Sequence, residues 1–216
     1  GKTGAKSLLA HRHCVGLISR LGVGLIKPSQ WSKRPLCAAA TGGFVGQILV
    51  QDQALEDLIV RWCFELETLV SDDVVIIGIR TGGEGLAERV LLHLRGAGKR
   101  VDLGLLDISL YRDDHGLRTG VPRVLGTDIP HDIDGREVLL IDDVFYTGRT
   151  IRAALSRLSD LGRPRCVRLA TLARRPGHQV PIAPDVVAFE VPEPGRSQRV
   201  QLDLNTRCLS LEKGNR

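Results

Sequence analysis

Two adjacent carboxylates directly follow a run of apolar residues near the middle of the chain. The run covers residues 138–141, and the acids are Asp142 and Asp143. A continuous apolar run is typical of a buried parallel strand, because helices cover both faces of such a sheet. Ligands of open α/β sheets bind just beyond the carboxyl ends of these strands. We therefore expect the two acids to bind hydroxyl groups of a polar ligand.

The loop after the acids has a composition suited to phosphate. It reads Thr147-Gly148-Arg149-Thr150, and apolar residues then recur at helical spacing over residues 151–161. The loop is therefore expected to open a helix. The first backbone N–H groups of a helix have no partner within it and attract anions. Carboxylates for hydroxyls beside amides for phosphate describe a site for a phosphorylated sugar.

These groups need a scaffold, and strands and helices are expected to alternate around them. The predicted strands are residues 74–79, 101–107, 138–141, 166–172, 186–191 and 200–204, and the predicted helices are 55–69, 86–94 and 151–161. This alternation predicts an α/β fold with a mostly parallel sheet flanked by helices. Asp52 is expected to cap its helix. Asp72 and Asp73 precede a strand, at the end opposite the ligand crevice, and are interpreted as a turn.

The composition is that of a globular domain with a basic N-terminal segment. The chain has 216 residues and a formal charge of +5, yet residues 1–51 contain seven basic and no acidic residues. We expect residues 1–46 to be a disordered or spurious extension, although organellar transit peptides share this composition. Residues 47–216 are then expected to form one domain. No run approaches the ~18 apolar residues that span a bilayer.

The cysteines favour a reducing compartment. There are five, scattered and without Cys-x-x-Cys spacing, so neither a disulfide scaffold nor a structural zinc site is indicated. A cytoplasmic setting is the simplest expectation.

The segment 138–150 resembles the 5-phosphoribosyl-1-pyrophosphate (PRPP) motif of type I phosphoribosyltransferases. In that family the acidic pair binds the ribose 2′- and 3′-hydroxyls, and the Thr-Gly-x-Thr loop holds the 5′-phosphate. The resemblance therefore implies substrate-binding roles, with the two acids also catalytic. The residues implied are Asp142, Asp143, Tyr146, Thr147, Gly148, Arg149 and Thr150.

Further segments resemble one branch of this superfamily, the PyrR-type pyrimidine-operon regulators and uracil phosphoribosyltransferases. They are Ile77-Gly78-Ile79-Arg80-Thr81-Gly82-Gly83, Asp107-Ile108-Ser109-Leu110-Tyr111-Arg112-Asp113-Asp114, Thr127-Asp128-Ile129-Pro130 and Leu161-Gly162-Arg163-Pro164. The resemblance implies a pyrophosphate loop, a hairpin lid over residues 107–123 and a C-terminal loop that covers the base. Arg80, Thr81, Gly82 and Gly83 are implied for the first, Tyr111 and catalytic Arg112 for the second, and Arg175, Val180, Pro181 and Ile182 for the third.

The base loop and the RNA-contacting segments of that branch differ here. Arg174 stands where relatives carry an acid, His178 where they carry arginine, and Gln179 where they carry glutamate. These differences leave the base preference open. A Gly-Lys-Asn segment implicated in RNA contact reads Ala188-Phe189-Glu190 here. Losing a lysine weakens RNA binding, because phosphate neutralisation dominates it. A basic patch of Arg163, Arg165 and Arg168 could replace that contact, or could be an ordinary solvated surface.

The resemblance implies an enzyme that converts uracil and PRPP to UMP and pyrophosphate, with Mg²⁺ carried mainly by PRPP and no protein ligand assigned. The implied partners are PRPP, a pyrimidine base and a messenger-RNA leader, without a membrane, in a homodimer or homotetramer. Two alternatives stay open. One is an RNA-binding attenuator that senses UMP or PRPP with little catalysis, and the other is a purine phosphoribosyltransferase.

Overall fold

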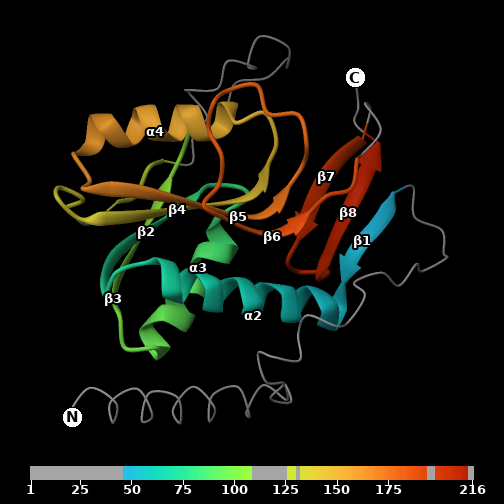
Figure 1. Ribbon diagram of the computed structural model, residues 1–216, viewed down its shortest axis with the longest axis horizontal. Coiled ribbons are helices and arrows are strands. Elements are labelled where there is room, and N and C mark those ends of the chain that lie inside the picture. The colour runs from blue at the N-terminus through green and yellow to red at the C-terminus, as the bar shows by residue number, and fades with distance from the viewer. Residues whose placement is uncertain (1–45, 109–125, 130–131, 194–197, 214–216) are drawn as a thin grey trace.

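The computed structural model describes residues 46–108, 126–129, 132–193 and 198–213. Three helices and eight strands lie in these ranges (Figure 1). The helices are α2 (Asp52–Leu69), α3 (Glu84–Gly96) and α4 (Arg149–Leu161). The strands are β1 (Gln47–Gln51), β2 (Asp73–Ile79), β3 (Arg100–Leu106), β4 (Glu137–Phe145), β5 (Cys166–Arg174), β6 (Val186–Glu190), β7 (Gln198–Asp203) and β8 (Cys208–Lys213).

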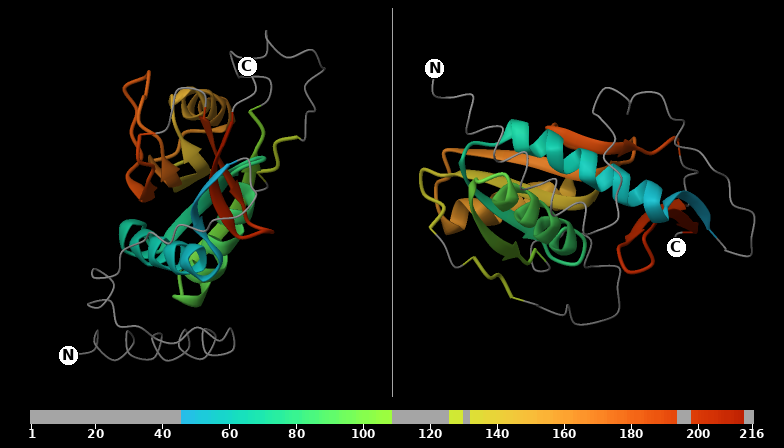
Figure 2. Two further views of the ribbon diagram at one scale, coloured as in Figure 1. Left: turned by 90° about the vertical axis from the view of Figure 1, so that its right-hand side faces the viewer. Right: turned by 90° about the horizontal axis from the view of Figure 1, so that it is seen from below.

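Five strands form a parallel sheet in the order β3-β2-β4-β5-β6. Helix α4 covers one face of this sheet, and α2 and α3 cover the other (Figures 1 and 2). The three-layer α/β arrangement confirms the fold class that the alternating pattern predicts. None of the helices in the described ranges is long and apolar enough to cross a membrane.

The apolar runs of the strands divide their side chains between two hydrophobic cores. Ile76 and Leu139 pack with α2 and α3, whereas their neighbours Ile77 and Leu140 pack with α4. This division follows from the strand period of two, which sends successive side chains to opposite faces. Because both faces are buried, the strands need no polar alternation, and this explains why their sequences are continuously apolar.

The strand order reverses between β2 and β4, and this reversal creates the crevice. After β2 the chain crosses to β3 on one side, whereas β4 lies on the other side and continues to β5 and β6. Helix α3 therefore leaves β2 toward one face, and α4 leaves β4 toward the opposite face. The loops that follow these strands diverge, which leaves room for a ligand between them.

A second, antiparallel sheet of three strands stands beside the first, in the order β1-β8-β7. Figure 1 shows it at the right, next to the ends of β4 and β5. Strands β1 and β8 are absent from the sequence-based prediction. The short β1 starts at the predicted domain boundary and pairs with β8. The partners Gln47 and Leu211 are 164 residues apart in the chain, so no local sequence pattern predicts this pairing.

Two local predictions are wrong. Asp52 does not cap α2, because the helix begins at Asp52 itself and its N-cap residue is Gln51, with no side-chain cap bond. The strand expected over residues 138–141 continues to Phe145, so the two acids lie within β4. Pairing explains this extension. The register with β2 ends at Ile141, but pairing with β5 continues as far as Phe145.

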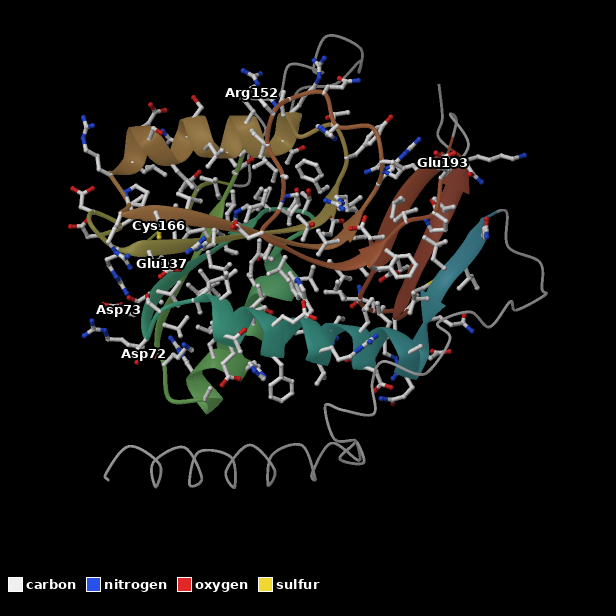
Figure 3. The ribbon with its side chains drawn as sticks, viewed as in Figure 1. Asp72, Asp73, Glu137, Arg152, Cys166 and Glu193 are labelled. Atoms are coloured by element: carbon white, nitrogen blue, oxygen red, sulfur yellow. The ribbon has the colours of Figure 1, made fainter. Side chains whose placement is uncertain are left out.

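Charged residues close the amino-terminal end of the parallel sheet, opposite the crevice. Asp73 lies there, next to Asp72 and Glu137 (Figure 3). It forms ion pairs with Arg100 and, at 2.6 Å, with Arg136. Two hydrogen bonds hold the pKa of Asp73 below its ordinary value. The bond from Arg100 has the larger effect on the pKa, and the bond from Arg136 has the next largest. The acid pair lies away from the crevice, as predicted, but the interpretation of both residues as a turn is wrong for Asp73, which is the first residue of β2 and is held there by pairing with Arg100 on β3.

Asp73→Asn is expected to lower stability at neutral pH and to have no such effect in strong acid. The folded-state pKa of Asp73 is depressed, so its stabilising contribution exists above the unfolded-state pKa and is lost as pH falls through the folded-state value. Urea unfolding of both proteins at pH 7 and at pH 3 or below measures this difference. Asp72→Asn is the matched control, because Asp72 is 98% exposed and its pair with Lys99 contributes little. A constant difference across pH would contradict the assignment.

Candidate functional site

A cavity of about 460 Å³ lies at the carboxyl ends of β2 and β4, where the strand order reverses. It is lined by three groups of residues. The parallel sheet and its loops contribute Ile79, Arg80, Thr81, Gly82, Asp107, Ile108, Asp142, Asp143, Val144, Phe145, Tyr146, Thr147, Gly148, Thr150 and Ile151. The loop after β5 contributes Arg175, and β7 contributes Arg199, Val200, Gln201 and Leu202. The cavity thus collects segments that are far apart in the sequence.

The acid pair lies on the part of β4 that has lost its β2 neighbour. One side of the strand is therefore open to the cavity, even though Asp142 and Asp143 are part of the strand. Each carboxylate accepts the N–H of the following residue. Asp142 Oδ1 accepts from the Asp143 amide at 3.0 Å, and Asp143 Oδ1 accepts from the Val144 amide at 2.7 Å. These bonds orient both acids before a ligand arrives.

The loop between β4 and α4 places a helix N-terminus beside the acids. Gly148 precedes α4 with φ of 81°, in the left-handed region that favours glycine. A Cβ at this position would lie 2.4 Å from Val180 Cγ2, so a side chain is also excluded by space. The first turn of α4 contains no acidic residue. The Arg149 amide donates to Thr147 Oγ1 at 3.3 Å. The amides at this helix N-terminus and the partial positive charge of the helix are suited to an anion.

The loop after β2 packs tightly against β4. A Cβ at Gly83 would lie 2.1 Å from the Ile141 carbonyl oxygen, and one at Gly82 would lie 2.5 Å from Asp143 Oδ1. Thr81 has φ of 75°, which is costly for a β-branched residue. Such strain is commonly found where a backbone is shaped for a ligand. Arg80, Thr81 and Gly82 line the cavity, whereas Gly83 does not, and its amide donates to the Ile79 carbonyl at 2.8 Å.

Two further contacts fix the Arg80 side chain and an acid beside it. Arg80 Nε donates to the Gly126 carbonyl at 2.7 Å, and the Gly126 amide donates to Asp107 Oδ2 at 3.1 Å. Asp107 is only 8% exposed and lines the cavity. It belongs to a segment quoted for the family resemblance, but the sequence did not mark it as a site residue.

Of the four residues expected in the base loop, the cavity is lined by Arg175 alone. Val180 packs against Gly148, Ile182 packs against the core beneath α4, and Pro181 is exposed. These three therefore support the loop without lining the cavity. Tyr111 and Arg112, expected on the lid, lie outside the described residues.

The substituted residues of the base loop have partners within the protein. Arg174 forms a two-bond pair with Glu190 on the neighbouring strand, at 2.9 and 2.6 Å, and does not line the cavity. Gln179 Oε1 accepts from Arg149 Nε at 3.1 Å. His178 is exposed. The arginine that replaces the family acid thus pairs with the glutamate that the β6 segment has gained.

Strand β7 forms a wall of the cavity that sequence reasoning missed. Residues 199–202 all line it, although successive side chains of a strand point to opposite faces. Four consecutive residues can border one cavity only where the edge of the strand faces it, and β7 is an edge strand of its sheet. The alternation of Arg199 and Gln201 with apolar residues predicts a strand. Nothing local shows that this strand lies over the acid pair.

One contact shows which backbone groups of β7 face the cavity side. Arg175 Nη1 donates to the Gln198 carbonyl, so this carbonyl points away from β8. In an antiparallel pair, residues alternate between those bonded to the partner strand and those directed outward. By this alternation the backbone N–H and C=O of Val200 are directed away from β8, on the free edge of β7. They supply one donor and one acceptor side by side.

The arginines of the expected basic patch are partly neutralised. Arg165 lies 3.4 Å from Glu137, and Arg168 lies 3.5 Å from Asp185. Arg163 is exposed, and its backbone N–H binds Asp134 Oδ1. This patch therefore offers less free positive charge than its sequence suggests.

Comparison with known proteins identifies relatives of the chain. Residues 47–203 match the phosphoribosyl transferase domain. A protein of Chloroflexus aurantiacus named "Bifunctional protein PyrR" is 49% identical over 133 residues, covering 61% of this chain and 72% of that protein. A protein of the same name from Bacillus cereus is 39% identical over 162 residues, covering 73% and 89% respectively.

Solved structures of purine enzymes share the fold. The hypoxanthine phosphoribosyl transferase of Trypanosoma cruzi superposes with a TM-score of 0.61 at 19% identity, covering 77% of this chain and 91% of that chain. The hypoxanthine-guanine enzyme of Bacillus anthracis gives 0.58 at 15% identity, covering 77% and 96%. At these identities the likeness establishes the fold and leaves the base undetermined.

Proposed function

The chain belongs to the phosphoribosyltransferase family and to its bifunctional PyrR branch, and we propose that it joins uracil to PRPP, giving UMP and pyrophosphate. One observation carries the proposal. A single cavity is lined by an acid pair, a helix N-terminus and a strained glycine-containing loop. These groups match the hydroxyls, the 5′-phosphate and the diphosphate of PRPP.

Catalysis would come from positioning and electrostatics. Amides at residues 147–150 would bind the 5′-phosphate, and Asp142 and Asp143 would bind the ribose hydroxyls. The ribose would then be fixed while the bond from C1′ to the diphosphate breaks and positive charge develops on the sugar. The Thr81–Gly82 backbone would stabilise the leaving diphosphate. Groups fixed in advance lower the barrier, because they need no reorganisation during the reaction.

Phosphoribosyltransferases generally use Mg²⁺ with PRPP, and we propose that the substrate itself carries most of the metal's ligands. Among the described residues, no three His, Cys, Asp or Glu side chains are grouped so that they could hold a metal ion. The open carboxylate edge of Asp143, next to Gly82, is suited to an outer contact with a metal on the diphosphate. When bound, Mg²⁺ would neutralise charge on the leaving group.

The base is proposed to bind between Arg175 and the edge of β7. The donor and acceptor of the Val200 backbone complement the adjacent ring N–H and carbonyl of uracil. Backbone recognition is unaffected by substitution of the base-loop side chains. Arg174, the most radical of those substitutions, pairs with Glu190 and does not line the cavity. The changed loop side chains therefore leave this recognition intact. Hypoxanthine and guanine carry the same adjacent ring N–H and carbonyl, so uracil is proposed over them because the relatives are PyrR proteins.

Pyrophosphate release measured with uracil, hypoxanthine, adenine and guanine in parallel tests this proposal. We expect PRPP- and Mg²⁺-dependent turnover with uracil, faster than with any purine. Turnover with adenine should be at least about tenfold lower, because adenine lacks an adjacent ring N–H and carbonyl and so loses one well-placed hydrogen bond. Faster turnover with hypoxanthine or guanine would instead identify a purine enzyme. No release with any base would favour a regulator that senses these ligands without turnover.

Binding of a messenger-RNA leader is a second candidate function. The relatives are named bifunctional, and exposed arginines lie along α4 and just after it, including Arg149, Arg152 (Figure 3) and Arg163. Phosphate contacts by arginine are the main source of RNA affinity. A gel-shift titration with the leader of the organism's own pyrimidine genes, with and without UMP, tests this role. Absence of a shift at low salt would exclude it.

A further inference from the structure

Three contacts join the end of β4 and the 5′-phosphate loop (residues 146–150) to the base loop (residues 174–182). The Arg175 amide donates to the Phe145 carbonyl at 2.8 Å, and the Gln179 amide donates to the Thr147 carbonyl at 2.9 Å. The third is the Arg149–Gln179 side-chain bond at 3.1 Å. Val180 also fills the space above Gly148. A displacement of one loop must therefore displace the other.

The Arg175 side chain extends this connection to β7. Its guanidinium carbon lies 4.2 Å from the centre of the Tyr146 ring, within range of a cation–π interaction. Its Nη1 atom donates to the Gln198 carbonyl at the start of β7. The residue is 9% exposed and lines the cavity. One side chain thus contacts the 5′-phosphate loop and the wall opposite it.

Burial makes these contacts energetically important. A buried cation is costly unless polar groups or an aromatic face compensate for lost water. Here the Tyr146 ring and the Gln198 carbonyl contribute to that compensation, and they belong to different parts of the cavity. If the Tyr146 ring or the Gln198 carbonyl moves away, the guanidinium loses a partner at a buried position where little water can replace it. The arginine therefore favours arrangements in which the 5′-phosphate loop and β7 keep their spacing.

We propose that Arg175 is a positioning residue that transmits PRPP binding at the 5′-phosphate loop to the base-binding edge of β7. The identity of the ligand rests on the proposed function. Ordering of Tyr146 by the phosphate fixes the guanidinium, and the guanidinium fixes Gln198 and the adjacent Val200. The base then meets a donor and an acceptor that are already in place.

Hydrogen–deuterium exchange, with and without PRPP and Mg²⁺, tests the connection without requiring any base. In the unaltered protein PRPP should slow exchange at residues 147–150 and also at residues 198–202. In Arg175→Gln the first effect should persist and the second should be lost. Persistence of the first effect also shows that this variant is folded and binds PRPP.

The matched control is Arg174→Gln, which changes the neighbouring arginine outside the cavity and should behave like the unaltered protein. Arg175→Lys keeps a charge and a donor but lacks the flat guanidinium, and should fall between the other two. Equal protection of residues 198–202 in the unaltered protein and Arg175→Gln would overturn the proposal, as would loss of protection in Arg174→Gln. If PRPP protects nothing at residues 147–150 in the unaltered protein, the proposed function itself fails.

Kinetics give an independent readout. Arg175→Gln should raise the KM for uracil about tenfold or more, the factor expected for loss of one charge-assisted hydrogen bond. The KM for PRPP should change by less than about threefold, because the 5′-phosphate loop retains its own amides. A larger rise in the KM for PRPP than for uracil would contradict the assignment.

Discussion

Replacing Asp142 and Asp143 together by asparagine is expected to give a folded protein whose pyrophosphate release is slower by about two to four orders of magnitude. Each carboxylate is expected to make hydrogen bonds to the ribose that gain strength as positive charge develops on the sugar. Asparagine has nearly the same shape and still offers one acceptor, so the backbone bonds from the Asp143 and Val144 amides can persist. What is lost is mainly the negative charge. Steady-state kinetics and thermal unfolding measure the two parts of this prediction.

A suitable control removes two other carboxylates by the same chemical change. Asp72 and Asp160 are exposed, lie outside the cavity and form surface ion pairs at 3.3 and 3.8 Å. Asp72→Asn with Asp160→Asn should therefore leave turnover within about twofold, since such pairs contribute little. A decrease of less than tenfold in the Asp142/Asp143 variant would show that the acid pair does not bind the reacting sugar.

Among the glycines that the structure describes, Gly83 is where replacement by alanine is expected to have the largest effect. The backbone at Gly83 has φ of −83°, so alanine is not conformationally excluded. The obstacle is space, because the new Cβ would lie 2.1 Å from the Ile141 carbonyl oxygen and 3.0 Å from the Ile79 nitrogen. Both are backbone atoms of central strands and cannot rotate away. We expect a loss of about 3 kcal/mol in unfolding free energy, at the upper end for overpacking, together with loss of PRPP binding.

Gly85→Ala provides the comparison two residues later, at the start of α3. Its Cβ would meet only Leu204 Cδ1, at 2.8 Å, and the end of a leucine side chain can move aside. Alanine also favours a helix over glycine by about 0.5–1 kcal/mol, so little net change is expected. Urea unfolding and calorimetric titration with PRPP distinguish the two variants. Equal behaviour of both would mean that the pyrophosphate loop is not packed against β4 as described.

Much of the parallel layer could be predicted from the sequence. The central strands β2 and β4 contain continuous apolar runs, and the apolar residues of α3 and α4 recur at helical spacing. The end of β4 could not be predicted, because its last four residues are held by pairing with β5 rather than by their own apolar character. The second sheet could not be predicted either. Its strands β1 and β8 are distant in the chain, and pairing between distant strands leaves no local periodic signal.

The candidate site divides in the same way, because its local motifs could be predicted and the residues contributed by distant segments could not. The motif at residues 138–150 and the loop at residues 80–83 are short and local. The structure brings most of their predicted site residues to one cavity, but Gly83 and Arg149 do not line it. By contrast, Asp107 and residues 199–202 line the cavity because of how distant segments pack together. The Arg174–Glu190 pair shows most clearly what the sequence alone cannot predict. Each residue is unusual for the family when considered alone, and only the register of β5 with β6 shows that they pair.

A crystal structure of the chain with UMP would test the central claim most directly. We predict that the 5′-phosphate lies against the backbone amides of residues 147–150, with the ribose hydroxyls at Asp142 and Asp143. The uracil ring should lie between Arg175 and the edge of β7, with its N3–H and one carbonyl bonded to the Val200 backbone. A nucleotide bound outside this cavity, or with its phosphate at the loop of residues 80–83 and its base away from β7, would contradict the account.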